Sequence, residues 1–186
     1  MRVNKPRIAP VRVDDVAKLD GAQKEMLDKL GKGPLLNIMG TLLNHPELMR
    51  RWMVFANHVL GKSTLPARER EVVILRIGYL CRSGYEWGQH VVIARRSGLS
   101  DDEIRRIKEG PKAKGWSEAD RLLLQATDEL HEDAFVGDAT WNALAKHFET
   151  QQMMDIVFAV GQYNLVSMAL NSFGVQAEPG LPTFDV

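Results

Sequence analysis

Residues 66–98 read PAREREVVILRIGYLCRSGYEWGQHVVIARRSG. Pro66 suits the first turn of a helix, where its missing N–H would have no intrahelical partner in any case. The apolar run at 72–75 predicts that the middle of this helix is buried nearly all round, and the flanking AREREV and CRS extend a helical frame. Gly84 interrupts the pattern, and Gly98 is placed to end a second helix. We therefore predict two consecutive helices here, the first of them in the core.

The helical period continues over most of the chain on both sides of this segment. Strand signals are nearly absent, because no alternating polar and apolar run is bounded by turn dipeptides. Ser100 and Glu103 form a capping box that opens another helix. We predict an all-α chain of about eight helices, the others covering 21–32, 34–46, 46–60, 117–130, 138–149 and 151–173.

The length of 186 residues suits one domain of ordinary size. Residues 1–19 show little periodicity and are predicted to form an extended N-terminal arm. Residues 20–176 are predicted to form a single helical domain. Residues 177–186 read as an irregular tail, since EPGLPTFDV has no period of either kind.

The overall charge excludes two classes of partner. The chain has 24 basic and 24 acidic residues, so its formal net charge is zero. A nucleic-acid-binding protein needs a basic patch, and an anionic membrane surface attracts polybasic segments. The longest apolar patches, such as 72–80, are far shorter than the roughly 20 residues that span a bilayer. One cysteine cannot form an internal disulfide, so nothing indicates secretion. We predict a cytoplasmic protein with neither kind of partner.

Glu86 and His90 stand four residues apart, which places both side chains on one face of a helix. From spacing alone, the favoured interpretation is a solvated ion pair. A carboxylate beside an imidazole can also divide general acid and base work. Zinc is a third possibility, but no further cluster of histidines or cysteines supplies the remaining ligands, so we predict no metal.

Glu71 and Cys81 are the other chemically notable residues. An ionised carboxylate next to an apolar run is costly to bury unpaired. Glu71 therefore either lies at an exposed edge, paired with Arg68 or Arg70, or is buried against a partner; residue statistics favour the edge. Cys81 lies in apolar surroundings, which favours an inert buried thiol.

Three segments resemble the carboxymuconolactone decarboxylase family, which includes the alkylhydroperoxidase D-like proteins. They are LPARERE at 65–71, YEWGQH at 85–90 and the stretch from Ala94 through GLS at 98–100. The resemblance implies an alkylhydroperoxidase D-like helical bundle that works without a cofactor. It also implies a site with catalytic Glu71, Glu86 and His90, and with Ser83, Tyr85 and Trp87 as substrate-binding residues.

The family divides on a C-x-x-C-x-x-x-H pattern in its alkylhydroperoxidase D-like branch. Counted back from His90, the two cysteine positions hold Ser83 and Glu86 here, so both thiols are missing. Cys81 lies two residues before the first thiol position. The upstream glutamate of that branch falls on Glu71, which is present. The resemblance therefore implies acid/base chemistry of the decarboxylase branch rather than redox chemistry.

Three functions follow as hypotheses. The first is a cofactor-independent acid/base enzyme that acts on a small carboxylated lactone or organic acid by proton transfer, with or without decarboxylation. The second is a peroxiredoxin-like antioxidant hydroperoxide reductase that uses Cys81 with an external thiol. The third is a non-catalytic binding or assembly protein on the same scaffold. Apolar, Met-rich helix faces and the family resemblance also predict a homo-oligomer, a trimer or hexamer.

Overall fold

The computed structural model describes residues 3–31 and 33–186, and within these ranges it is all-helical with no strand. The predicted all-α bundle is confirmed. One short 3₁₀ helix, Val13–Lys18, lies in the N-terminal arm that we expected to be extended. The α-helices are α1 (Gly21–Leu30), α2 (Asn37–Leu42), α3 (Pro46–Gly61), α4 (Ala67–Leu80), α5 (Gly84–Arg96), α6 (Asp101–Glu109), α7 (Glu118–Asp133), α8 (Asp138–Leu144) and α9 (Thr150–Phe173).

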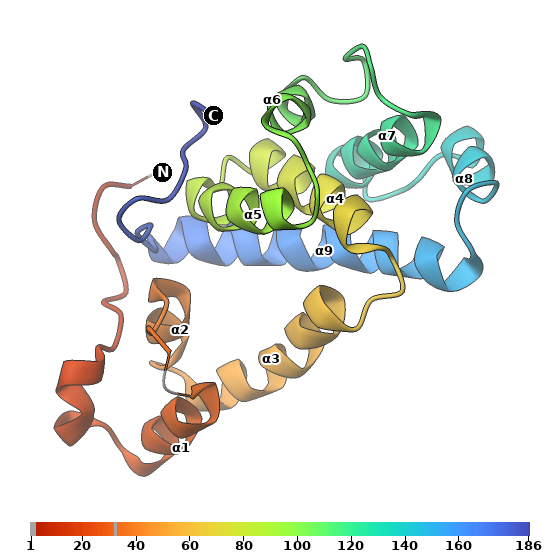
Figure 1. Cartoon of the computed structure of the whole chain (residues 1–186). Coiled ribbons are helices and arrows are strands. Elements are labelled where there is room, and N and C mark those ends of the chain that lie inside the picture. The colour runs from red at the N-terminus through yellow and green to blue at the C-terminus, as the bar shows by residue number, and fades with distance from the viewer. Residues whose placement is uncertain (1–2, 32) are drawn as a thin grey trace.

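Helix α4 is the centre of the molecule. It packs most extensively against α5, α7 and α9 (Figure 1). Its residues 71–78 are all buried, as the apolar run predicted, and Val72 through Leu75 have no exposed surface. Gly78 lets α5 come close, since a Cβ at this position would lie 3.3 Å from Glu86 Cγ. The sequence of α4 therefore fixes where α5 and its polar side chains lie.

Helices α1, α2 and α3 form a smaller unit beside this core. They share an apolar cluster around Met26, Leu43 and Met49, and they face α9 across a gap between ribbons (Figure 1). Helix α2 is shorter than the predicted 34–46. It begins at Asn37, after the extended Leu36, and ends before the turn that leads into Pro46. Proline disfavours helical backbone in the residue before it, so His45 cannot continue α2 and instead caps α3.

The two ends of the chain run over the helices without forming long elements. The N–H groups of Arg7 and Ile8 both donate to the carbonyl oxygen of Phe173 at the end of α9. In the C-terminal tail, the carbonyl of Thr183 accepts from the indole N–H of Trp87. The arm and the tail thereby tie down α9 and α5, the two helices that flank the candidate site.

Helix α9 is long and apolar enough to cross a membrane by length and composition, but half of its most apolar stretch is buried inside the fold. It packs against α3, α4, α5 and α7. This packing is that of the core helix of a soluble protein. Its outer face still exposes several large apolar side chains, namely Met154, Phe158, Leu165 and Met168. The predicted homo-oligomer stays a prediction.

Candidate active site

Three ionisable side chains meet between α4 and α5. Glu71 lies in α4, and Glu86 and His90 lie one turn apart on α5. His90 Nδ1 is 2.6 Å from Glu71 Oε2, and His90 Nε2 is 2.9 Å from Glu86 Oε1. The imidazole therefore stands between two carboxylates. We call this group of three residues the carboxylate–imidazole centre.

All three residues of this centre are buried, with exposed fractions of 0% for Glu71, 4% for Glu86 and 6% for His90. The edge position that residue statistics favoured for Glu71 is wrong. Arg70 does contact it, with Nε 3.3 Å from Glu71 Oε1. Burial is tolerated because Glu71 has two cationic neighbours, and with both carboxylates ionised the four charges sum to zero.

The two carboxylates hold His90 differently. Glu71 makes a short hydrogen bond to Nδ1. Glu86 Oε1 is close enough to Nε2 for an ion pair, yet it makes no hydrogen bond of normal geometry to any residue in the described ranges. The oxygen is thus held by charge but lies off the line of a good N–H···O bond. A buried acceptor in this state retains capacity for another donor.

The charge of His90 follows from its surroundings. Burial by itself lowers the pKa of His90, but Glu86 and Glu71 outweigh that effect and raise the pKa to about 10. At neutral pH the imidazole is therefore protonated and carries an N–H on each nitrogen. One N–H faces Glu71, and the other lies on the side of Glu86.

A cavity of about 160 Å³ opens onto this centre. Glu86 and His90 line it, whereas Glu71 does not, so Glu71 holds the imidazole from behind. The other polar groups in the wall are Asn57, Tyr85, Gln89, Gln162 and Tyr163. Apolar side chains from α2, α3, α5 and α9 complete it: Ile38, Met39, Trp52, Met53, Ala56, Leu60, Ile93 and Val166, with Leu36 ahead of α2. Apolar walls with a few convergent polar groups are typical of small-molecule sites.

Tyr163 packs its ring against His90. The two rings meet edge to face, with centroids 4.8 Å apart and planes at 82°. Burial raises the pKa of Tyr163, and the negative charges of Glu86 and Glu71 raise it further. The phenol therefore stays neutral, and its hydroxyl group is a hydrogen-bond donor in the wall of the cavity.

Tyr85 is held at the rim by the C-terminal tail. Its hydroxyl donates to Glu178 Oε1 at 3.0 Å, and Gln89 Nε2 donates to Glu178 Oε2 at 2.7 Å. Burial and the nearby Glu178 carboxylate raise the pKa of Tyr85, so it also stays protonated. Glu178 accepts a third bond from the backbone N–H of Asn37, at 2.7 Å. This network joins α2, α5 and the tail at one edge of the cavity.

Two of the predicted substrate-binding residues do not line the cavity. Trp87 is fully buried in the main core against Tyr79 and Phe184, because the i+1 position after Glu86 points to another face of α5. Ser83 precedes the first turn of α5 and is also fully buried, and its hydroxyl has no partner in the part of the chain that the structure describes. Tyr85 alone of the three predicted residues reaches the cavity wall.

Cys81 lies at the end of α4, outside the wall of this cavity. Its thiol donates to Asn164 Oδ1 at 3.0 Å, and His131 Nδ1 is 4.0 Å from the sulfur. The residue is buried, as predicted. Cys81 therefore lies apart from the cavity at the carboxylate–imidazole centre, and the peroxide hypothesis stays a prediction.

The polar residues of α9 were missed in the sequence. Gln162 and Tyr163 are buried and line the cavity, although they lie more than seventy positions after His90. A glutamine among the mostly apolar residues on the inner face of α9 is the signal that could have indicated them. Among residues 3–31 and 33–186, no group of three or more His, Cys, Asp or Glu side chains has the arrangement of a metal site.

Comparisons with known proteins agree with this fold. Residues 46–129, which include all three residues of the centre, match the model of the carboxymuconolactone decarboxylase family. No curated protein matches the chain.

Solved structures of similar fold cover most of the chain. An uncharacterised peroxidase-related protein from Ralstonia eutropha, with an alkylhydroperoxidase AhpD core, has a TM-score of 0.76 at 19% identity over 95% of each chain. A protein of unknown function from Agrobacterium tumefaciens, for which antioxidant defence of the AhpD type is suggested, has a TM-score of 0.69 at 23% identity, covering 74% of this chain and 94% of its own. The debrominase Bmp8, solved with 2,3,4-tribromopyrrole, has a TM-score of 0.70 at 16% identity, covering 92% of this chain and 91% of its own. At these identities the likeness establishes the fold alone.

Proposed function

We propose that this chain, a member of the carboxymuconolactone decarboxylase family, is a cofactor-independent acid/base enzyme. Its substrate is a small carboxylated lactone or organic acid, which it converts by proton transfer with or without loss of carbon dioxide. The observation that carries the proposal is the buried imidazole of His90 between Glu71 and Glu86, with two of these three side chains lining a cavity.

The environment divides the roles of the three residues. His90 is the acid, because its raised pKa keeps it protonated at neutral pH. Glu86 is the base, since its Oε1 lies at the cavity without a hydrogen bond of normal geometry to the described residues. Glu71 is a positioning residue, because its hydrogen bond to Nδ1 fixes the imidazole orientation from outside the cavity.

Proton transfer then proceeds with a simple balance. The Glu86 carboxylate takes a proton from a carbon next to a carbonyl group. The electron pair of that C–H bond moves toward the carbonyl oxygen, which receives a hydrogen bond or proton from His90 Nε2. Tyr163 and Gln162 line the same cavity and supply further donors for the developing oxyanion. Return of the proton to a different carbon completes an isomerisation.

Decarboxylation uses the same groups, but Glu86 acts after the bond has broken and gives a proton instead of taking one. The bond between the substrate carbon and its carboxylate breaks, and carbon dioxide leaves. The electron pair enters the same enolate, stabilised by His90. Glu86, protonated from solvent, then gives its proton to the carbon. The net change exchanges one carbon dioxide for one proton, so no oxidant or reductant is needed.

The test is turnover of carboxymuconolactone in heavy water, followed by carbon dioxide release and by deuterium in the product. We expect both signals from the native protein and neither from His90→Gln. His147→Gln is the matched control, because this histidine lies outside the cavity and is expected to leave both signals unchanged. Deuterium uptake without carbon dioxide supports proton transfer but places the reaction among isomerisations. No deuterium uptake by the native protein would overturn the proposal.

A further inference from the structure

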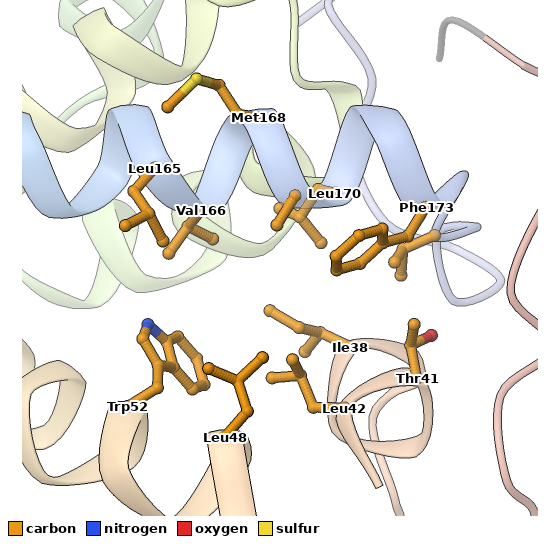
Figure 2. A pocket seen from close by; sticks show the side chains of 12 residues that line it. Ile38, Thr41, Leu42, Leu48, Trp52, Leu165, Val166, Met168, Leu170 and Phe173 are labelled. Atoms are coloured by element: carbon orange, nitrogen blue, oxygen red, sulfur yellow. The ribbon is translucent and has the colours of Figure 1, made fainter. Parts of the chain in front are cut away.

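A second cavity adjoins the candidate active site. It has a volume of about 330 Å³ and lies between α2 and α3 on one side and α9 on the other (Figure 2). Ile38, Leu42 and Leu48 form one wall, and Leu165, Leu170 and Phe173 are among the residues of the other. We call it the apolar groove. It is twice as large as the cavity at His90, and it lies in the size range of sites for small organic ligands.

The two cavities adjoin each other at three side chains. Ile38, Trp52 and Val166 line both of them. The indole of Trp52 therefore stands between the cavity at Glu86 and His90 and the groove. The carboxylate–imidazole centre and the apolar groove can be parts of one binding site, with a polar end and an apolar end.

A second observation also indicates a ligand at this junction. The indole N–H of Trp52 is buried and has no hydrogen-bond partner within the described residues. Figure 2 shows the indole nitrogen on the side of Trp52 that faces α9. A buried N–H donor without an acceptor is unfavourable, and native proteins rarely leave one so unless a ligand or solvent completes it.

The rest of the groove offers a ligand no comparable polar group. Its one hydroxyl belongs to Thr41, which donates to the carbonyl of Asn37 at 2.7 Å and is satisfied within α2. Three apolar side chains of its lining stay about half exposed, with Leu48 at 48%, Leu165 at 50% and Met168 at 56%. The groove therefore selects for apolar surface along its length and for one acceptor at Trp52.

From the shared wall of the two cavities and the unpartnered indole N–H we infer that the substrate is amphipathic, an acid or lactone with an apolar substituent that fills the groove and with an oxygen that accepts from Trp52 Nε1. The inference rests on the proposed acid/base function and names its substrate class. A bare small acid would fill only the cavity at His90. A chain or ring attached to it would remove the exposed apolar surface of the groove from water.

The test is calorimetric binding of γ-lactones with alkyl side chains from methyl to hexyl. These probes are neutral, so Glu86 does not repel them, and their carbonyl oxygen can accept from Trp52. We expect the Kd to fall about fourfold for each added methylene, the ratio that burial of one methylene gives. A Kd that does not change with chain length would overturn the inference.

Variants locate the effect. Ala169→Phe places a large ring in the groove and is expected to remove the gain with chain length while leaving the methyl lactone bound. Leu165→Ser is the milder alternative, because its half-exposed position tolerates a polar group, and it is expected to flatten the chain-length dependence. Trp52→Phe is expected to weaken every lactone by roughly two- to tenfold, the range for one lost hydrogen bond. Val54→Ser is the control, since Val54 lies on α3 but lines neither cavity.

The outcomes separate this inference from the proposed function. Chain-length dependence without carboxymuconolactone turnover supports the groove and contradicts the acid/base proposal. Turnover with equal affinity for all lactones does the reverse. The alternative is that a second copy of the chain covers the groove. In that case, raising the protein concentration would raise the measured molecular mass and lower the affinity for lactones. That result would overturn the inference.

Discussion

Helix α4 carries two buried charged residues, and their surroundings differ in a way that separates structure from chemistry. Arg76 uses four of its five N–H donors: Nε and Nη2 bind both oxygens of Asp128 at 2.6 and 2.8 Å, and Nη1 donates to the carbonyls of Ile107 and Lys108, each at 2.9 Å. It lines neither the cavity at His90 nor the apolar groove. Glu71, five residues earlier, contacts His90, which in turn contacts Glu86. Glu86 lines a cavity, and its Oε1 has no well-formed hydrogen bond to the described residues.

In this fold, a buried charge whose partners are all satisfied differs from one that leaves an acceptor incomplete. The guanidinium of Arg76 is paired with the carboxylate of Asp128 and with two backbone carbonyls. These bonds join α4 to α7 and to the end of α6. At the carboxylate–imidazole centre, one acceptor is left incomplete next to space that a small molecule can enter. Removal of a partner should therefore reduce stability at the first site and reduce turnover at the second.

Glu86→Gln gives the largest expected effect. It removes the base but keeps the size of the side chain, so we expect turnover of carboxymuconolactone to fall about 10²- to 10⁴-fold, the usual contribution of a placed acid or base. The melting temperature should fall as well, because Glu86 helps to raise the pKa of His90, so turnover is compared per folded molecule. Steady-state kinetics and thermal unfolding test both statements. Glu129→Gln is the control, because this carboxylate bonds Thr140 and the N–H of Gly137, away from the cavity. A loss of stability with full turnover would contradict the assignment of Glu86 as the base.

Asp128→Ala tests the other half of the comparison. It leaves the Arg76 guanidinium buried without its carboxylate, which should lower the free energy of unfolding by about 3–5 kcal/mol. Denaturant titration measures this loss. Turnover per folded molecule should stay at the native level below the unfolding transition. A fall in turnover with native stability would instead place Arg76 and Asp128 in the chemistry.

Gly110→Ala should have a smaller effect at the same place. Gly110 has a φ of +83°, and an added Cβ would lie 2.5 Å from Arg76 Nη2. We expect a loss of about 1–3 kcal/mol from the backbone conformation, with a further loss from displacement of the guanidinium. Gly98→Ala is the matched variant, since its φ is +96° and nothing lies within 4 Å of the added Cβ. Equal losses in the two variants would show that Arg76 does not depend on this close approach.

The sequence predicted the local features of this molecule better than the distant ones. The apolar run of α4 indicated its burial, and the spacing of Glu86 and His90 indicated a shared face, because both depend only on helical geometry. The burial of Glu71 was missed, since it depends on α5 folding back to place His90 beside it. A carboxylate next to arginines is more often at a surface. The contact with His90 overrides this preference, and it cannot be seen in the pattern along α4 alone.

The cavity itself depends on residues that come together only in the folded chain. Trp52 from α3 and Tyr163 from α9 both line it, and neither has a local motif that marks it. Trp87 was wrongly placed at the site because it stands beside Glu86 in sequence, whereas adjacent residues on a helix point about 100° apart. The Glu178 network was equally hidden, since the tail has no period to indicate its course.

The proposed acid role of His90 requires that its imidazole be protonated at neutral pH. Because the pKa of His90 is raised to about 10 in the folded chain, the folded state keeps a proton that the unfolded chain loses near its ordinary pKa of about 6.5. The stabilisation from this proton is therefore complete below that ordinary value and is lost as the pH rises through about 10. Nitrogen NMR of the histidine side chains, assigned with His90→Gln, follows this proton directly. We predict an imidazolium at neutral pH with a midpoint near 10. A neutral ring at that pH, with a midpoint at or below 6.5, would contradict it.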